Sequence, residues 1–133
     1  MTRGSFILNL CQFFGSEYKD VFSRGLDKGW LEYEDQLYSE DPIVRKNVAR
    51  IIHMYLMKEK GISDLPSIKE AEILHDLYDC RVCANHIAQI FMRGIMDAKD
   101  LAVKGGFLVF DPEGIDDDET ILVQLKRAAE MVE

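Results

Sequence analysis

The chain has no apolar run of the length that a bilayer helix requires, which is about 18 residues or more. Its first apolar run, residues 6–11, is short and is followed directly by Gln12, unlike the core of a signal peptide. We therefore expect no membrane insertion and no signal peptide within this sequence.

Basic residues are scarce. The 133 residues include 16 lysines and arginines against 24 aspartates and glutamates, which gives a net charge of −8. Nucleic-acid binding normally needs a basic face, and adsorption to anionic lipid needs basic clusters. The charge therefore argues against both classes of partner.

Cysteine is also scarce, and its number is odd. Three cysteines exclude a complete disulfide framework. Two states remain open: three reduced thiols, or one bridge and a spare thiol.

No segment alternates apolar and polar residues for long enough to predict a strand. The apolar fraction of 47% and the charged fraction of 30% are typical of a soluble globular domain. Apolar residues instead recur at helical spacing, so we predict one all-α domain of about six helices. The expected helices cover approximately residues 3–14, 17–25, 42–60, 67–77, 80–93 and 116–129.

Local signals predict where several helices begin and end. Thr2 is placed to cap the first helix, and Asp41 before a proline predicts a helix start at Pro42. Residues 67–70 form a Ser-Ile-Lys-Glu capping box, and Asp79 is the expected cap of the central helix.

One helix ending occurs twice. Residues 22–26 read Phe-Ser-Arg-Gly-Leu, and residues 91–95 read Phe-Met-Arg-Gly-Ile. Each glycine is followed, after a polar loop, by a second helix start, at residues 41–45 and 114–117. A chain that repeats helix, glycine stop, loop and helix is typical of repeat proteins, which more often bind than catalyse.

The order of these segments resembles the S-layer homology family, a bacterial cell-surface module. Three segments resemble the family's Ile-Thr-Arg helix opening, and two resemble its aspartate-containing lead-in. They are Met1-Thr2-Arg3, Ile43-Val44-Arg45 and Ile115-Asp116-Asp117 for the opening, and residues 18–21 and 77–79 for the lead-in. Val82 stands where the family usually has tryptophan.

The resemblance implies degenerate helix-loop-helix repeats with pseudo-threefold packing: a half repeat at 1–15 and repeats at 16–61 and 62–133. It also implies a non-catalytic module at the cell surface that attaches to a wall-linked, often acidic polysaccharide. Arg3 and Arg45, each in the first turn of a helix, would then contact acidic groups together with free N–H groups. Asp20 and Asp79 would organise the loops.

Trp30, in a loop with tyrosines nearby, is the aromatic residue expected to stack on a sugar ring. The alternative is that Trp30 folds back as a lid on the first loop. Both placements are open on sequence.

Two departures weaken the expectation of glycan binding, and the three cysteines and the absence of a signal peptide favour an alternative function. Asp116 and Asp117 would repel an acidic sugar, and the net charge of −8 does not attract anions. The alternative is an intracellular, cytoplasmic helical protein-interaction domain that has lost glycan binding.

Cys80, Cys83 and His86 are the candidate metal ligands, with His75 nearby. A structural zinc site normally takes four ligands, and only one Cys-x-x-Cys is present, so we expect no metal and no cofactor. A thioredoxin-like site needs a preceding strand, which is not expected here. No serine or second carboxylate accompanies His86, so we do not expect an enzyme.

Overall fold

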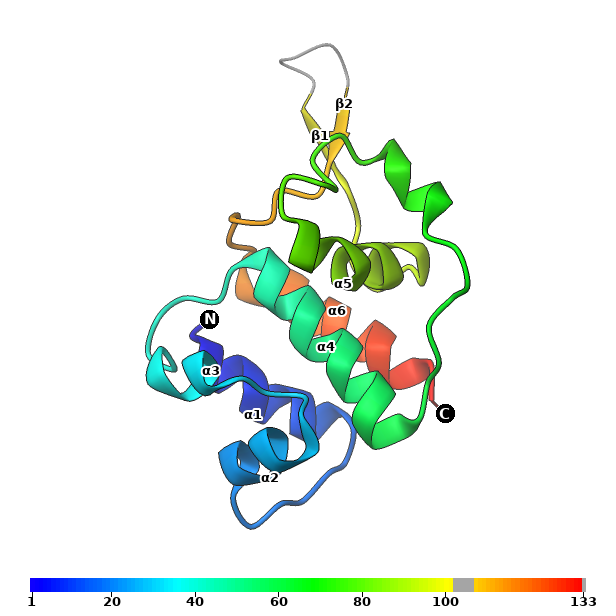
Figure 1. The fold of residues 1–133 in the computed structure, drawn as a ribbon. Coiled ribbons are helices and arrows are strands. Elements are labelled where there is room, and N and C mark those ends of the chain that lie inside the picture. Colours follow the sequence, from blue (N-terminus) through cyan, green and yellow to red (C-terminus); the bar gives the residue numbers. More distant parts are fainter. Residues whose placement is uncertain (102–106, 133) are drawn as a thin grey trace.

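The computed structural model describes residues 1–101 and 107–132 (Figure 1). In these ranges the protein is mostly helical, which confirms the all-α class. The elements are α1 (Arg3–Phe13), α2 (Val21–Lys28), α3 (Tyr33–Leu37), α4 (Arg45–Lys60), the 3₁₀-helix η1 (Lys69–Ile73), α5 (Arg81–Met92), β1 (Lys99–Leu101), β2 (Phe107–Val109) and α6 (Asp118–Glu130). No helix in the described ranges is long and apolar enough to cross a membrane.

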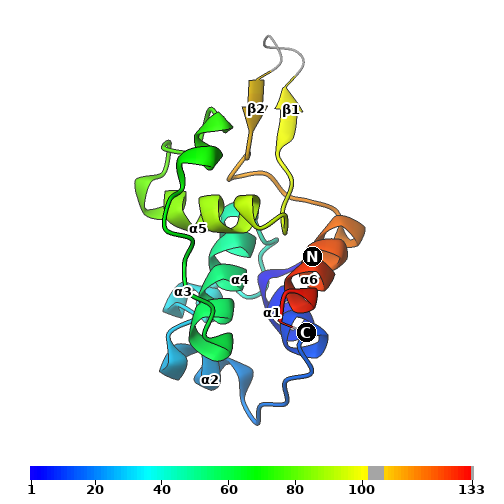
Figure 2. The same ribbon diagram turned by 90° about the vertical axis from the view of Figure 1, so that its right-hand side faces the viewer.

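Helix α4 runs through the middle of the molecule, and α5 packs across it (Figures 1 and 2). Helices α1 and α6 lie side by side, as Figure 2 shows. The short strands project away from the helices as a hairpin. The largest fully buried side chains come from α1, α4, α5 and the connecting loops, and they form one core; they include Phe6, Trp30, Tyr55, Ile87 and Phe110.

The first turns of α1 and α4 are held by the same pattern of main-chain hydrogen bonds. Arg3 and Gly4 donate their backbone N–H groups to the carbonyls of Asp41 and Ser39, both at 2.8 Å. At the start of α4, Arg45 and Lys46 donate in the same way to Gly114 and Pro112, at 2.8 and 2.9 Å. Each of these helix starts is therefore bonded to the segment that precedes a later helix.

The predicted start of α4 at Pro42 is wrong. Pro42 pairs with Thr2 as an isolated antiparallel bridge, and Ile43 donates its N–H to the carbonyl of Met1 at 3.0 Å. This pairing keeps the segment extended, so the helix begins three residues later, at Arg45.

The predicted end of α2 at Gly25 is also wrong. The helix continues to Lys28 and ends at Gly29, which has a φ of 86°. Gly25 lies inside the helix, where an added Cβ would stand 2.4 Å from the side chain of Leu31. Glycine is needed there for close packing rather than for a stop.

Two further segments differ from the expected helices. The capping box at 67–70 opens only one 3₁₀ segment, although Ser67 Oγ accepts the N–H of Lys69 at 3.2 Å. The strands β1 and β2 pair antiparallel, with Lys99 opposite Val109. Three residues per strand are too few for a period-two pattern, so the sequence does not indicate them.

Candidate functional site

Arg45 does not reach solvent. Its side chain is 3% exposed, and all three guanidinium nitrogens donate within the fold. Nε bonds the carbonyl of Phe110 at 2.7 Å, one terminal nitrogen bonds Asp116 at 2.5 Å, and the other bonds the carbonyl of Asp97 at 2.7 Å. The prediction that Arg45 contacts a ligand is therefore wrong, because its whole donor set is used internally.

Arg3 is also turned inward. Its side chain is 13% exposed and bonds the buried carboxylate of Asp35 at 3.3 Å. Arg50 bonds both oxygens of the same carboxylate, at 2.6 and 3.0 Å. The prediction that Arg3 contacts an acidic ligand is corrected accordingly: its charge neutralises Asp35 together with Arg50.

The free N–H groups that the anion-binding prediction requires are absent from both helix starts within the described structure. The first amides of α4 all donate to backbone carbonyls. Those of α1 donate to backbone carbonyls and to the Thr2 hydroxyl, which accepts from Ser5 at 3.1 Å. An anion would have to displace these bonds, so neither helix start is an anion site.

Trp30 is fully buried, so it is not a stacking platform for a sugar. Its ring packs edge-on against Tyr55, with ring centroids 4.8 Å apart. Its indole N–H has no hydrogen-bond partner among the described residues. The lid alternative describes Trp30 better, because the indole closes the core above α4.

The two loop aspartates have different positions. Asp20 caps α2: its carboxylate accepts the backbone N–H of Ser23 at 3.2 Å and the hydroxyl of the same residue at 3.1 Å. Asp79 is exposed, and the residue at the N-cap of α5 is Cys80 rather than Asp79. The carboxylate that organises the second loop is Asp76, which accepts the N–H groups of Phe110 and Asp111 at 2.7 and 2.8 Å.

These five predicted ligand contacts do not form one site. Asp20 lines a shallow hollow of about 610 Å³ beside Tyr18 and Arg24. Arg45 lies at the base of a separate hollow of about 450 Å³, beside α6. Sequence reasoning therefore selected residues that mostly hold the fold.

The cysteines form one bridge and one spare thiol, the second of the two open states. Cys80 and Cys83 are joined by a disulfide, and Cys11 is free and buried. The bridge closes within the first turn of α5 and joins no two elements. In the chain-entropy model, a ring of four residues adds only about 2 kcal/mol to stability. No group of three or more His, Cys, Asp or Glu side chains in the described ranges is placed to hold a metal ion.

His86 is the end of a short polar chain that sequence reasoning missed. Its Nδ1 lies 2.7 Å from Nδ1 of His53, and Nε2 of His53 lies 2.6 Å from the carboxylate of Asp64. Burial lowers the pKa of His86 to about 4, helped by the neighbouring charges of His53 and Arg50. His86 is therefore neutral at pH 7. The three residues are 11 or more positions apart, so no local motif indicates the chain.

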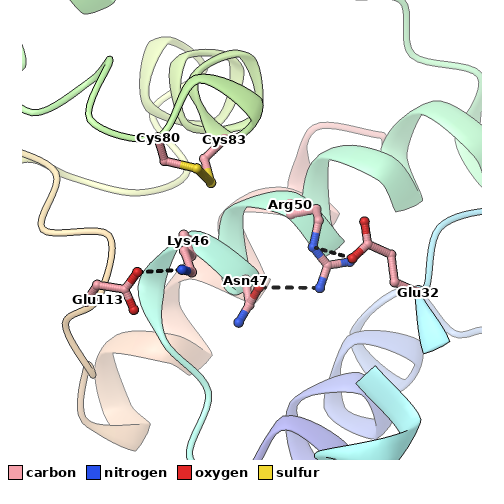
Figure 3. Close-up of a disulfide and its surroundings, with 7 residues drawn as sticks. All are labelled: Glu32, Lys46, Asn47, Arg50, Cys80, Cys83 and Glu113. Atoms are coloured by element: carbon pink, nitrogen blue, oxygen red, sulfur yellow. Dashed lines mark hydrogen bonds and ion pairs between the residues drawn. A yellow bond between two sulfur atoms is a disulfide. The ribbon is translucent and has the colours of Figure 1, made fainter. Parts of the chain in front are cut away.

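A groove between α4 and α5 brings cations, the bridge and this histidine together. Its volume is about 280 Å³. Figure 3 shows the disulfide above the start of α4, with Lys46 and Asn47 beneath it and Arg50 one turn further along. The residues that line the groove are Glu32, Lys46, Asn47, Arg50, Val82, Cys83 and His86.

The two cations of the groove are held differently. Lys46 pairs with Glu113, whose side chain is 71% exposed, so water competes for the pair. Arg50 is anchored by Asp35 and also lies 3.9 Å from the exposed Glu32. Lys46 can therefore leave Glu113 for another anion at little cost, whereas the guanidinium of Arg50 is held in place by Asp35. Their spacing of one helical turn on α4 is the sequence signal that could have indicated the groove.

Comparison of the chain with models of protein families, with curated proteins and with solved structures finds no match in any of the three. The resemblance to the S-layer homology family therefore depends on the quoted motifs.

Proposed function

We propose that the chain is a non-catalytic binding module that takes an acidic group of a wall-linked polysaccharide in the groove between α4 and α5. Support comes from one observation: Lys46 and Arg50 line the same hollow from successive turns of α4, with the amide of Asn47 between them. A carboxylate in the groove would accept a charge-assisted hydrogen bond from Lys46, and the charge of Arg50, whose terminal nitrogens already bond Asp35, would attract it. The amide of Asn47 would select a neighbouring hydroxyl.

Releasing Lys46 from its present partner costs little free energy. Glu113 is mostly solvated, so a ligand carboxylate replaces a weak surface ion pair rather than a buried one. Arg50 needs no rearrangement, because Asp35 already fixes its guanidinium. The cost of ordering the site is therefore small.

Sedimentation with purified bacterial cell-wall sacculi tests the proposal. The protein should co-sediment at low salt, and retention should fall as salt rises, because the contact is ionic. Lys46→Gln should weaken binding about tenfold, the effect of losing one charge-assisted hydrogen bond.

Lys58→Gln is the matched control, since it makes the same charge change near the other end of α4 and lies outside the groove. Equal loss in the two variants would show only a general charge effect. No retention of the wild-type protein at low salt would exclude wall attachment.

The alternative is a helical protein-interaction domain without glycan binding. What favours it is the burial of Arg45 and Trp30, the two residues that best matched a glycan site. Fractionation of the source cells separates the two proposals: the wall-attachment proposal requires the protein in the wall fraction, and the alternative requires it in the cytosol.

A further inference from the structure

The Cys80–Cys83 disulfide lies where it can react and where little of the fold depends on it. Cys80 is the N-cap of α5, and Cys83 is the third residue of that helix. Both side chains are half-buried, and Val82 between them is 84% exposed. The bridge crosses no boundary between elements, so opening it removes no covalent link between packed elements.

Cys83 faces the groove between α4 and α5, where two cations, Lys46 and Arg50, outnumber one carboxylate, Glu32. It lines the same hollow as Lys46, Arg50 and His86, whereas Cys80 does not line it (Figure 3). Cys83 is therefore the cysteine that a thiol in the groove meets. The reactive species is the thiolate, so cations along the path raise its local concentration.

We propose that Cys80–Cys83 is a reversible thiol–disulfide exchange site that reacts with anionic thiols entering the groove. The incoming thiolate attacks Sγ of Cys83; the S–S bond breaks, and its electron pair goes to Cys80. A mixed disulfide forms at Cys83. A second thiolate then attacks the outer sulfur of that mixed disulfide, which releases Cys83 and the oxidised small-molecule disulfide.

The step is balanced: two thiols lose two electrons and two protons, and the two cysteines gain them. We expect Cys80 to be the better leaving group because it is the N-cap residue of α5, at the positive end of the helix dipole. A stabilised leaving thiolate departs faster. The helix dipole thus favours Cys80 as the leaving group, and the cations of the groove favour anionic thiols.

Rates of reduction by a matched pair of thiols test the proposal. Mercaptoethanesulfonate is anionic away from its sulfur, and mercaptoethanol is neutral there. The reaction is quenched with acid and the free thiols are alkylated. The tryptic peptides are then identified by mass spectrometry. Trypsin cleaves after Arg81, which separates Cys80 from Cys83 and locates the mixed disulfide.

We expect both thiols to open the bridge while the far-ultraviolet circular dichroism of the protein stays unchanged. Lys46→Gln should slow mercaptoethanesulfonate about threefold or more and slow mercaptoethanol by a smaller factor, because the reacting thiolate of the first carries two negative charges and that of the second carries one. Lys58→Gln should change neither rate. The early mixed disulfide should lie on the peptide that contains Cys83.

The proposal is overturned if the bridge opens only when the chain unfolds. A mixed disulfide on Cys80, or equal slowing of both thiols by Lys46→Gln, also contradicts it. Exchange does not require a saccharide in the groove, so failure to sediment with sacculi leaves this result unaffected, and the reverse also holds.

Discussion

Arg45 donates a hydrogen bond of 2.5 Å to the carboxylate of Asp116, and the two side chains are 3% and 7% exposed. This pair connects the first turn of α4 to the segment that leads into α6. It is a buried structural ion pair, to which Lys99 and Gln124 also contribute through the Asp116 carboxylate.

Arg45→Ala should therefore destabilise the protein by about 3 kcal/mol, because the carbonyls of Phe110 and Asp97 lose their donor and the buried Asp116 keeps only Gln124 at 2.9 Å and Lys99 at 3.5 Å. Urea unfolding measures the loss. Arg127→Ala is the control: Arg127 pairs with Asp97 at 3.1 Å, but both side chains are well exposed, so its loss should stay below about 1 kcal/mol. Equal stability of Arg45→Ala and wild type would contradict the structural role.

Gly25→Ala tests the close packing of α2 against Leu31. The new Cβ would lie 2.4 Å from the Leu31 side chain, so the loop must shift, at a cost of about 1–3 kcal/mol. Leu31→Ala removes the atoms that clash. The double variant should therefore lose less stability than the sum of the single variants, and strict additivity would show that the two residues are not in contact.

Stability should fall as the solution is acidified from about pH 6.5 to pH 4. An unfolded histidine has a pKa of about 6.5, whereas burial holds the pKa of His86 at about 4 in the fold. Between these values the unfolded chain binds a proton that the folded chain does not bind. The contribution of His86 is therefore complete above pH 6.5 and is lost below it.

The loss should be on the order of 1–2 kcal/mol, because water partly screens the half-buried ring. Urea unfolding at a series of pH values measures it. His86→Gln keeps a hydrogen-bonding side chain without the titration, so its stability should vary less over this window. An identical pH profile for the variant would assign the effect to another group.

Cys11 should resist thiol reagents in the native protein. Burial raises the pKa of its thiol to about 11, and the charge of Glu59 adds to the shift. Native protein with the bridge closed should therefore take up almost no label at pH 8, and protein in denaturant should take up one per chain. Rapid native labelling at Cys11 would place it nearer the surface than the structure does.

The sequence predicts a helix well where apolar residues recur at helical spacing over several turns. Helix α1, with Thr2 as its cap, and the amphipathic body of α4 were found in this way. The start of α4 was missed because Pro42 pairs with Thr2, and a contact over that separation leaves no local trace. The sequence does not distinguish a glycine that terminates a helix from one that allows close packing, so the packing role of Gly25 was not predicted.

The site was harder to predict than the fold. Arg45 was expected in solvent because its partners, Asp116 and Phe110, lie more than sixty residues away in sequence. The bridge between Cys80 and Cys83 was one of two states that the cysteine count left open. The groove combines residues of α4 and α5 with Glu32 at the start of α3, so its existence depends on how these helices pack.

The bonds that join the starts of α1 and α4 to later segments are made by peptide groups alone. Almost any amino acid offers the same donor and acceptor, with proline the exception as a donor. Substitutions at these positions can therefore accumulate while the joints persist. A fold held by backbone hydrogen bonds of this kind can therefore persist while the sequence at these positions changes.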